Sequence, residues 1–301
     1  MEGDPQSNVP LAPLTTWKIG GPAEWFWAPS DEQELLQALE WARDKELPVH
    51  VLGRGSNVLV ADAGLPGLVI YLREFVADEV QYETLEGNVT QIEVPSGMSL
   101  PRFSKVVAQL GYGGYEFYIG IPGTVGGAVT INAGYGPGDE RQTANRCTEV
   151  RTVSLNGDVE WNPYSAFNPV YRHTDLVGSN RIVTAARFVL KERSSKEQIR
   201  AETAKHLAMR HERQPLTRPT AGSVFKGTPE GVPAAVYIDR CGLKGHRVGD
   251  AMVSQKHANW IENTGEASAD DVLQLIEEIK ATVREREGVD LEPEVRYLQG
   301  A

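Results

Sequence analysis

A serine with small and basic neighbours, in the segment RPTAGSVFKG at residues 218–227, is a first candidate for chemistry. A nucleophilic serine needs the G-x-S-x-G turn and a partner base. Here Ala221 and Phe225 occupy the two glycine positions, so that pattern fails on both sides of Ser223. The residues alone leave a proton donor and a turn residue as the alternatives, and they favour the turn residue.

Two glycine-rich segments favour a bound nucleotide. The segment LGRGSNVLV supplies five candidates whose backbone N–H groups suit pyrophosphate oxygens: Gly53, Arg54, Gly55, Ser56 and Asn57. It is not the G-x-G-x-x-G fingerprint, because position 58 is valine and a second strand follows. The segment IPGTVGGAVTINAG contributes Gly123, Gly126 and Gly127, which permit close approach to a flat ligand. A β-turn explains the first segment alone and tight packing the second, but together they favour a nucleotide cofactor.

Arginines in two segments are candidates for binding anions. Arg172 follows Tyr171 in YRHT, where an isolated arginine is typical of an exposed charge. Arg210 and Arg213 lie near the end of a predicted helix in LAMRHERQP. There they either complement the helix macrodipole or bind phosphate or carboxylate oxygens with their forked donors.

The elements that must position these residues begin with a mixed α/β segment. Ser30 and Gln33 have the spacing of a capping box before a helix with one apolar face. After Pro48, residues 49–53 predict a buried strand, and residues 58–61 and 68–72 are further short apolar runs. Glycine-rich connections join these elements, as in α/β domains.

The middle and the end of the chain alternate strands with two long helices. We expect a helix that Gly111 stops, and a hairpin with Asn156-Gly157 at its turn. Residues 180–193 predict a long strand, residues 194–215 a charged helix and residues 268–288 an amphipathic one. A strand-like tail follows, in which Glu292 and Glu294 share one face. Such a terminal carboxylate pair mostly faces solvent.

Composition narrows the class of protein. A chain of 301 residues holds two or three domains, and 41% hydrophobic with 24% charged residues is typical of a soluble globular protein. The net charge of −11 argues against nucleic-acid binding, although one basic pocket for a small anion stays open. Two cysteines indicate neither a metal site nor a disulfide framework. With no signal segment and no apolar run near the ~20 residues of a membrane span, we expect a cytoplasmic protein.

The ordered set of segments resembles one family closely. TTWKIGGPAEWF, GRGSNVLV, IPGTVGGAV, NAG, YR, AGSVFK, GLKG, VSQKHANWIEN and LEPEVRYLQG occur in the order seen in the UDP-N-acetylenolpyruvoylglucosamine reductase family. The resemblance runs from about Thr15 to Tyr297. Single motifs are weak, but the ordered set is highly specific. The short spacing between Arg172 and Ala221 resembles the type that lacks an extra tyrosine loop.

The resemblance implies an α+β architecture: the FAD-binding fold of the vanillyl-alcohol oxidase and p-cresol methylhydroxylase group, plus a C-terminal α+β substrate domain. It implies an FAD-binding subdomain at residues 1–73, joined by a C-terminal strand at 289–301. A second FAD-binding subdomain is expected at 74–213, and a substrate-binding domain at 214–288.

The resemblance also implies a reaction. An NADPH-dependent flavoenzyme reduces the enolpyruvyl ether of UDP-N-acetylglucosamine to UDP-N-acetylmuramate, a UDP-N-acetylmuramate dehydrogenase activity in peptidoglycan synthesis, cell wall biogenesis, cell shape and cell division. Hydride passes from NADPH to FAD and then to the enolpyruvyl group. We expect non-covalent FAD and a monomer with no nucleic-acid or membrane partner.

Residue roles follow from the resemblance. Arg172 and Glu294 are expected beside the carboxylate where enolate charge grows. Ser223 is expected to donate the proton, because a carbanionic enolate is a strong enough base to accept one from a weak acid. The implied FAD-binding residues are Gly53, Arg54, Gly55, Ser56, Asn57, Gly123, Gly126, Gly127 and Arg210. The implied substrate-binding residues are Tyr171, Arg213, Lys226 and Lys244, since two phosphates call for cations.

Some features depart from the family pattern, and two other functions stay open. NAGYGPGDE replaces the more typical Asn-Ala-Gly-Ala-Tyr-Gly-x-Glu, and Gly227 stands where asparagine is usual. A flavin oxidase of the same fold group would reoxidise with oxygen and need no NADPH. A binding protein without turnover would hold flavin that NADPH never reduces.

Overall fold

The computed structural model describes residues 4–77, 80–85, 89–135, 141–229 and 231–300. The chain divides into two compact units, and both contain helices and strands, as the α+β prediction requires. Unit 1 comprises Met1–Pro5, Phe26–Arg54 and Leu68–Arg210, and unit 2 comprises Gln6–Trp25, Gly55–Gly67 and His211–Ala301. Within the described ranges, no helix is long and apolar enough to cross a membrane.

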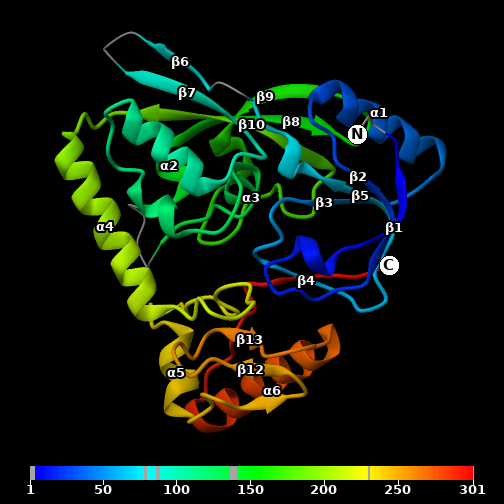
Figure 1. Cartoon of the computed structure of the whole chain (residues 1–301), viewed down its shortest axis with the longest axis vertical. Coiled ribbons are helices and arrows are strands. Elements are labelled where there is room, and N and C mark those ends of the chain that lie inside the picture. Colours follow the sequence, from blue (N-terminus) through cyan, green and yellow to red (C-terminus); the bar gives the residue numbers. More distant parts are fainter. Residues whose placement is uncertain (1–3, 78–79, 86–88, 136–140, 230, 301) are drawn as a thin grey trace. The chain divides into compact units, whose positions relative to one another are not determined.

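A five-stranded antiparallel sheet organises unit 1 (Figure 1). Its order is β6 (Gln81–Thr84), β7 (Thr90–Pro95), β10 (Arg181–Leu190), β8 (Cys147–Ser154) and β9 (Val159–Pro163). The central strand β10 confirms the long strand predicted at 180–193, and its Ala186 lies opposite both Val94 and Val150. The β8–β9 hairpin is also confirmed, because Gly157 adopts φ +95° at the turn.

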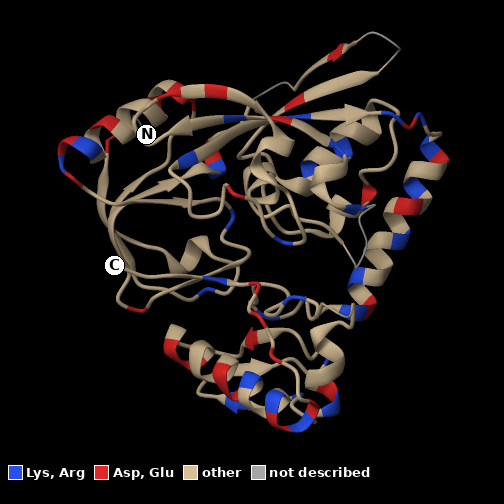
Figure 2. Cartoon of the chain, turned by 180° about the vertical axis from the view of Figure 1, so that it is seen from behind, with Lys and Arg blue, Asp and Glu red and all other residues tan. Residues whose placement is uncertain are grey.

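Two short helices pack on this sheet and form the core of unit 1 with it. Helix α2 (Leu100–Gln109) begins where the Ser99 hydroxyl accepts a hydrogen bond from Arg102 N, and Gly111 with φ +80° follows its end, as predicted. Helix α3 (Val125–Thr130) contacts β7 and β10. Helix α4 (Lys196–Arg213) confirms the predicted charged helix, with residues of both signs along its length (Figure 2).

Two predictions for the first helix and strand of unit 1 are wrong in detail. Helix α1 (Glu32–Asp44) is capped by Asp31, whose side chain accepts from Glu34 N, while the Glu34 carboxylate accepts from Ser30 N. The expected Ser30–Gln33 box is therefore displaced by one residue. Strand β3 (Val49–Leu52) is not fully buried, since Val51 is 42% exposed.

Strand β3 is exposed because it is an edge strand. The sheet order is β1 (Gln6–Pro10), β2 (Pro22–Trp27), β5 (Leu65–Tyr71) and β3. Strand β3 ends this order and, among the described strands, pairs in parallel with β5, with Val49 opposite Leu68. A largely apolar strand at a sheet edge therefore leaves part of its surface in solvent.

Unit 2 has a core between a helix pair and a small sheet. The sheet order is β11 (Arg247–Val248), β12 (Ala251–Val253) and β13 (Ile261–Asn263), and the helices are α5 (Ala234–Arg240) and α6 (Ala269–Glu287). Helix α6 lies beside β12 (Figure 1) and buries the predicted apolar face. Its ends follow the sequence signals, because a Ser268–Asp271 capping box begins it and Gly288 in the left-handed region ends it.

The C-terminal strand of unit 2 pairs with a strand from early in the chain. Strand β14 (Arg296–Leu298) runs parallel to β4 (Val58–Val60), with Tyr297 opposite Leu59. The strand that follows the GRGSN loop is thereby joined to the segment that contains Glu294.

Candidate functional site

In unit 1, two glycines of the predicted cofactor site lie against one threonine. A Cβ atom at Gly53 would lie 2.8 Å from Thr124 Oγ1. The same hydroxyl accepts a hydrogen bond from Gly127 N at 3.3 Å at the start of α3. Thr124 is buried whereas Gly127 is exposed. The end of β3 and the start of α3 therefore form one small cradle in which a side chain at Gly53 has no room.

A third glycine, Gly126, is explained by packing. Its N–H donates to Ser96 O at 2.9 Å, and a Cβ atom there would lie 2.8 Å from Ser96 Cβ. Gly123 accepts from Leu100 N at 3.0 Å and so fixes the loop before α3. The packing alternative thus holds for Gly126, while Gly127 has space for a Cβ, 3.6 Å from Thr124 Oγ1.

Two arginines of unit 1 form a positively charged site. Burial, and the charge of Arg54, lower the pKa of the Arg210 guanidinium. Among the residues that the structure describes, the buried Nε of Arg210 has no hydrogen-bond partner. Like charges with an unsatisfied donor favour an anion. These residues therefore fit the diphosphate of FAD.

The second half of the GRGSN loop belongs to unit 2 and is held by backbone contacts. Gly55 adopts φ +63°, and a Cβ atom there would lie 2.6 Å from Leu14 O. Thr16 N donates to Gly55 O at 2.9 Å. Asn57 Nδ2 donates to Glu294 O at 3.2 Å, and Arg296 N donates to Asn57 O at 3.1 Å. Gly55 is therefore required by the turn, and Asn57 attaches the loop to the C-terminal segment.

The Tyr171-Arg172 pair forms the tip of a tight turn in unit 1. Val170 and His173 exchange two backbone hydrogen bonds, of 3.0 and 3.2 Å, across it. Arg172 adopts φ +57°, an uncommon conformation for arginine. Its Nη2 donates to Gly134 O at 2.9 Å, and its Cζ lies 4.9 Å from the centre of the Tyr171 ring. The arginine is thus held at a defined place, whereas the sequence alone favoured an exposed charge.

Asn132, which the sequence analysis did not assign, holds this turn. It is 1% exposed and adopts φ +48°. Its Nδ2 donates to Val170 O at 2.9 Å, and its Oδ1 accepts from Ala144 N at 2.9 Å. A polar residue between the apolar Ile131 and Ala133 was the signal available in the sequence. Residues 136–140 of the altered NAGYGPGDE segment lie outside the described residues.

Ser223 lies in an extended segment of unit 2. It opposes Trp260 in an antiparallel β-bridge, and Phe225 opposes Pro293 on the other side. Gly222 before it has φ +85°, which supplies the turn into the segment. Glu294 N donates to Val224 O at 2.7 Å, so the Ser223 and Glu294 segments are directly paired.

The predicted substrate-binding cations of unit 2 have different surroundings. Lys226 Nζ lies 2.5 Å from Glu292 Oε1, and Lys244 Nζ lies 2.9 Å from Asp239 Oδ2. Burial, and the charges of Lys244 and Arg213, lower the pKa of His257. Lys244 and Arg213 therefore both lie within electrostatic range of His257, a residue that the sequence analysis left unassigned.

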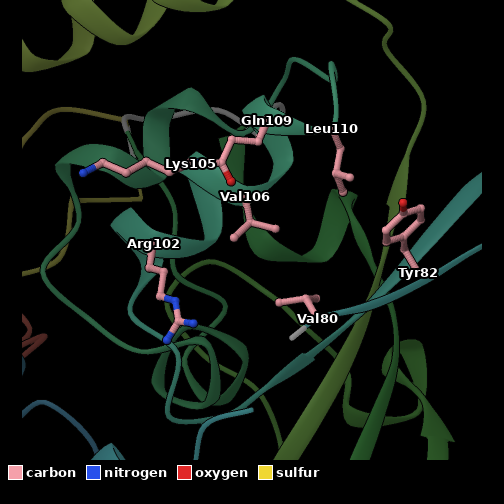
Figure 3. Close-up of a pocket in the computed structure, with 7 residues that line it drawn as sticks. All are labelled: Val80, Tyr82, Arg102, Lys105, Val106, Gln109 and Leu110. Carbon is pink, nitrogen blue, oxygen red and sulfur yellow. The ribbon is translucent and has the colours of Figure 1, made fainter. Parts of the chain in front are cut away.

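A groove in unit 1 lies apart from these residues. Figure 3 shows it beside α2 and β6, with a volume of about 510 Å³. It is lined by Val80, Tyr82, Arg102, Lys105, Val106, Gln109 and Leu110. None of the predicted cofactor, substrate or catalytic residues lines it.

Two family models match the chain. Residues 23–162 match the model described as "FAD binding domain". Residues 214–298 match the model described as "UDP-N-acetylenolpyruvoylglucosamine reductase, C-terminal domain". The first match confirms the predicted FAD-binding fold.

Relatives and a solved structure match nearly the whole chain. A UDP-N-acetylenolpyruvoylglucosamine reductase of Synechococcus sp. (strain CC9311) is 40% identical over 298 residues, covering 97% of this chain and 93% of the relative. One from Synechococcus sp. (strain JA-3-3Ab) is 41% identical over 303 residues, covering 99% and 92%. The crystal structure of UDP-N-acetylenolpyruvylglucosamine reductase from Thermus caldophilus matches with a TM-score of 0.79 and 36% identity, over 98% of each chain.

Proposed function

The chain belongs to the UDP-N-acetylenolpyruvoylglucosamine reductase family, and on this premise we propose that it reduces the enolpyruvyl ether of UDP-N-acetylglucosamine to UDP-N-acetylmuramate, a peptidoglycan precursor, with NADPH as reductant. The observation that carries the proposal is the match to reductases over 97% of the chain at 40% identity. A partial match would support only one domain, whereas this one includes both glycine-rich loops and the Ser223 segment.

Unit 1 supplies residues that would hold FAD without a covalent bond. Arg54 and Arg210 would bind the diphosphate, since their like charges and the buried Arg210 Nε fit an anion. Gly127, which is exposed at the start of α3, would let the backbone approach a flat ring or sugar, and Gly53 would keep the end of β3 close to the same Thr124. Gly123 and Gly126 of unit 1, together with Gly55, Ser56 and Asn57 of unit 2, complete the proposed set. Bound FAD would supply the hydride for the substrate.

The residues proposed as catalytic have to stabilise the negative charge that hydride addition creates on the substrate, and one of them has to supply a proton. Addition of hydride to the terminal carbon leaves an electron pair on the adjacent carbon, delocalised into the carboxylate. We assign Arg172 to this carboxylate, because its guanidinium is already held by Gly134 O and needs no reordering. Glu294 would share a proton with the same oxygens. Ser223 Oγ would donate its proton to the adjacent carbon and complete the lactyl ether.

The substrate's diphosphate requires cations from a chain of net charge −11. The charges of Arg213 and Lys244 both lower the pKa of His257. This shared neighbour supports the proposal that the two cations bind the diphosphate. Lys226 is proposed as a further substrate contact, three residues after Ser223, and Tyr171 as a contact beside Arg172. With these roles we propose residues 214–288 as the substrate domain, after FAD-binding subdomains at 1–73, joined by the strand at 289–301, and at 74–213.

Flavin absorbance tests the function. Anaerobic NADPH should bleach the visible absorbance of the holoprotein, and the enolpyruvyl UDP-sugar should then restore it. No recovery on adding that substrate would refute the reductase. Flavin that NADPH leaves oxidised, but that an alcohol or sugar reduces and oxygen then rapidly reoxidises, would indicate an oxidase. Flavin that none of these reductants bleaches would indicate a binding protein.

Ser223→Ala tests the proton donor separately. This variant should keep the rate of flavin reduction by NADPH and lose most of the substrate turnover, about 10²-fold or more. Turnover near that of the unmodified enzyme would remove Ser223 from the assigned role while leaving the function intact.

A further inference from the structure

One asparagine side chain fixes the segment that contains Ser223. In unit 2, Phe225 N donates to Asn259 Oδ1 at 2.9 Å, and Asn259 Nδ2 donates to Phe225 O at 2.8 Å. Asn259 is 6% exposed and Phe225 is 1% exposed, so both bonds are shielded from water. The amide therefore satisfies both backbone polar groups of Phe225, as a neighbouring strand would.

The same segment is bonded on both sides. Val224 N donates to the backbone oxygen of Asn259 at 2.9 Å, which places Ser223 opposite Trp260. On the other side, Glu294 N donates to Val224 O at 2.7 Å. The Ser223 segment therefore lies between the turn that contains Asn259 and the segment that contains Glu294.

We propose that Asn259 is a positioning residue: its amide holds the backbone at Phe225 so that Ser223 and Glu294 keep one fixed spacing. This inference rests on the proposed function, because the roles assigned to Ser223 and Glu294 make that spacing matter. A displacement of about 1 Å at reacting groups lowers rates about 10²-fold. Loss of the clamp should therefore act on the step at the substrate and not on flavin reduction by NADPH.

The amide is required because it offers one donor and one acceptor. An ionised carboxylate in Asn259→Asp keeps the acceptor for Phe225 N but repels Phe225 O. A protonated carboxyl restores the donor, and burial raises the pKa of such a group. The titratable groups on its own turn are Lys256 and His257, and those on the paired segments are Lys226, Glu292 and Glu294. The variant should therefore regain activity relative to the unmodified enzyme as the pH falls.

Asn263→Asp is the matched control. Asn263 is 5% exposed, its Nδ2 donates to Trp17 O at 3.1 Å, and its Oδ1 accepts from Gly265 N at 3.0 Å. It is an equally buried amide of the same unit, but its side chain does not bond the Ser223 segment. Any general effect of a buried carboxyl on unit 2 appears in both variants.

The test compares two half-reactions of each holoenzyme over a range of pH. In Asn259→Asp, reduction by NADPH should stay within about twofold, while reoxidation by the enolpyruvyl UDP-sugar slows about 10- to 100-fold and recovers as the pH falls. Asn263→Asp should show no such selective loss. Asn259→Ser, which keeps a hydroxyl donor and acceptor with shorter reach, serves as a second variant and should show the loss without the recovery.

Two results would overturn the inference. One is reoxidation of both Asn259 variants at the unmodified rate. The other is a parallel fall of both half-reactions, which indicates general loss of structure. Failure of the unmodified enzyme to reoxidise with this substrate would refute the proposed function itself, so the two failures are distinguishable.

Discussion

Lys226 Nζ lies 2.5 Å from Glu292 Oε1, and the backbones of the same two residues are joined by a 2.9 Å bond from Lys226 N to Glu292 O. The lysine side chain is 22% exposed and the glutamate side chain 70% exposed. The pair therefore holds the ammonium group beside a largely exposed carboxylate. An anion bound by Lys226 has to share this group with Glu292 or displace it.

Removing the carboxylate should improve substrate binding. Glu292→Gln is expected to lower the KM for the UDP-sugar about two- to fivefold, because an exposed ion pair contributes up to ~1 kcal/mol. Lys226→Met should raise the same KM about tenfold or more. Steady-state kinetics at saturating NADPH measure both effects. Glu277→Gln, which removes the carboxylate 2.7 Å from Lys280 on α6, controls for the lost charge. An unchanged KM in both Lys226 and Glu292 variants would contradict the placement of Lys226 at the substrate.

A substitution at Gly127 can distinguish a glycine that a bound ligand requires from a glycine that packing of the fold requires. Gly127 is an exposed residue within α3, and a Cβ there makes only an ordinary contact, 3.6 Å from Thr124 Oγ1. Gly127→Ala should therefore raise the stability of the flavin-free protein by about 0.5–1 kcal/mol. If FAD lies against this residue, the same change should weaken FAD binding about 10- to 100-fold through overpacking.

Gly126→Ala is the matched comparison for Gly127→Ala. Its Cβ would lie 2.8 Å from Ser96 Cβ, so this variant should lose stability even without flavin. Thermal unfolding of the flavin-free proteins and titration with FAD distinguish the two variants. Unchanged FAD affinity in Gly127→Ala would place the cofactor away from α3.

The sequence predicts elements whose signals are local. Helix α6 follows its apolar spacing and its terminal Ser268 and Gly288, because capping and periodicity act within a few residues. Strand β3 has the apolar composition of a buried strand, yet Val51 is exposed. Its single pairing with β5 decides this exposure, and pairing partners are not encoded in the strand itself.

The site depends on contacts between residues far apart in the chain. The two bonds between Phe225 and Asn259 join positions 34 residues apart, and both residues look like ordinary parts of their own segments. The left-handed backbone of Arg172 is likewise invisible in YRHT, because Asn132 imposes that turn through Val170. The family resemblance identified Ser223 and Arg172 as candidates. The hydrogen bonds that hold their segments, from Asn259 and Asn132, are seen only in the fold.

The charge of Arg210 should lower the stability of the flavin-free protein but strengthen the binding of FAD. The pKa of Arg210 is lowered by burial and by Arg54, so the charge is disfavoured in the flavin-free fold. Arg210→Met should therefore leave that fold as stable or more stable. FAD affinity should fall about 10- to 100-fold through loss of a charge-assisted hydrogen bond. The affinity of the unmodified protein should decrease with salt more steeply than that of the variant. Equal salt dependence would remove Arg210 from the diphosphate site.

A buried histidine gives unit 1 a pH-dependent stability. His206 is 7% exposed on α4, its Nε2 lies 3.3 Å from Glu202 Oε1, and its ring packs edge-on to Tyr135. Burial lowers the pKa of His206 below its ordinary 6.5, and Glu202 partly offsets this. Below about pH 6.5 the unfolded chain therefore takes up a proton before the folded one. Stability is full above that pH and is lost as the pH falls toward the folded pKa.

Two variants on α4 should change this loss of stability at low pH in opposite directions. His206→Gln removes the titrating group, so its unfolding free energy should fall less between about pH 7 and pH 5. Glu202→Gln removes the carboxylate that raises the pKa of His206, so its unfolding free energy should fall more over the same range. Thermal or denaturant unfolding of the flavin-free proteins measures the slopes, and each variant is compared with itself so that any packing cost cancels. If the unfolding free energy changed with pH equally in both variants and in the unmodified chain, His206 would have the same proton affinity in the folded and unfolded states.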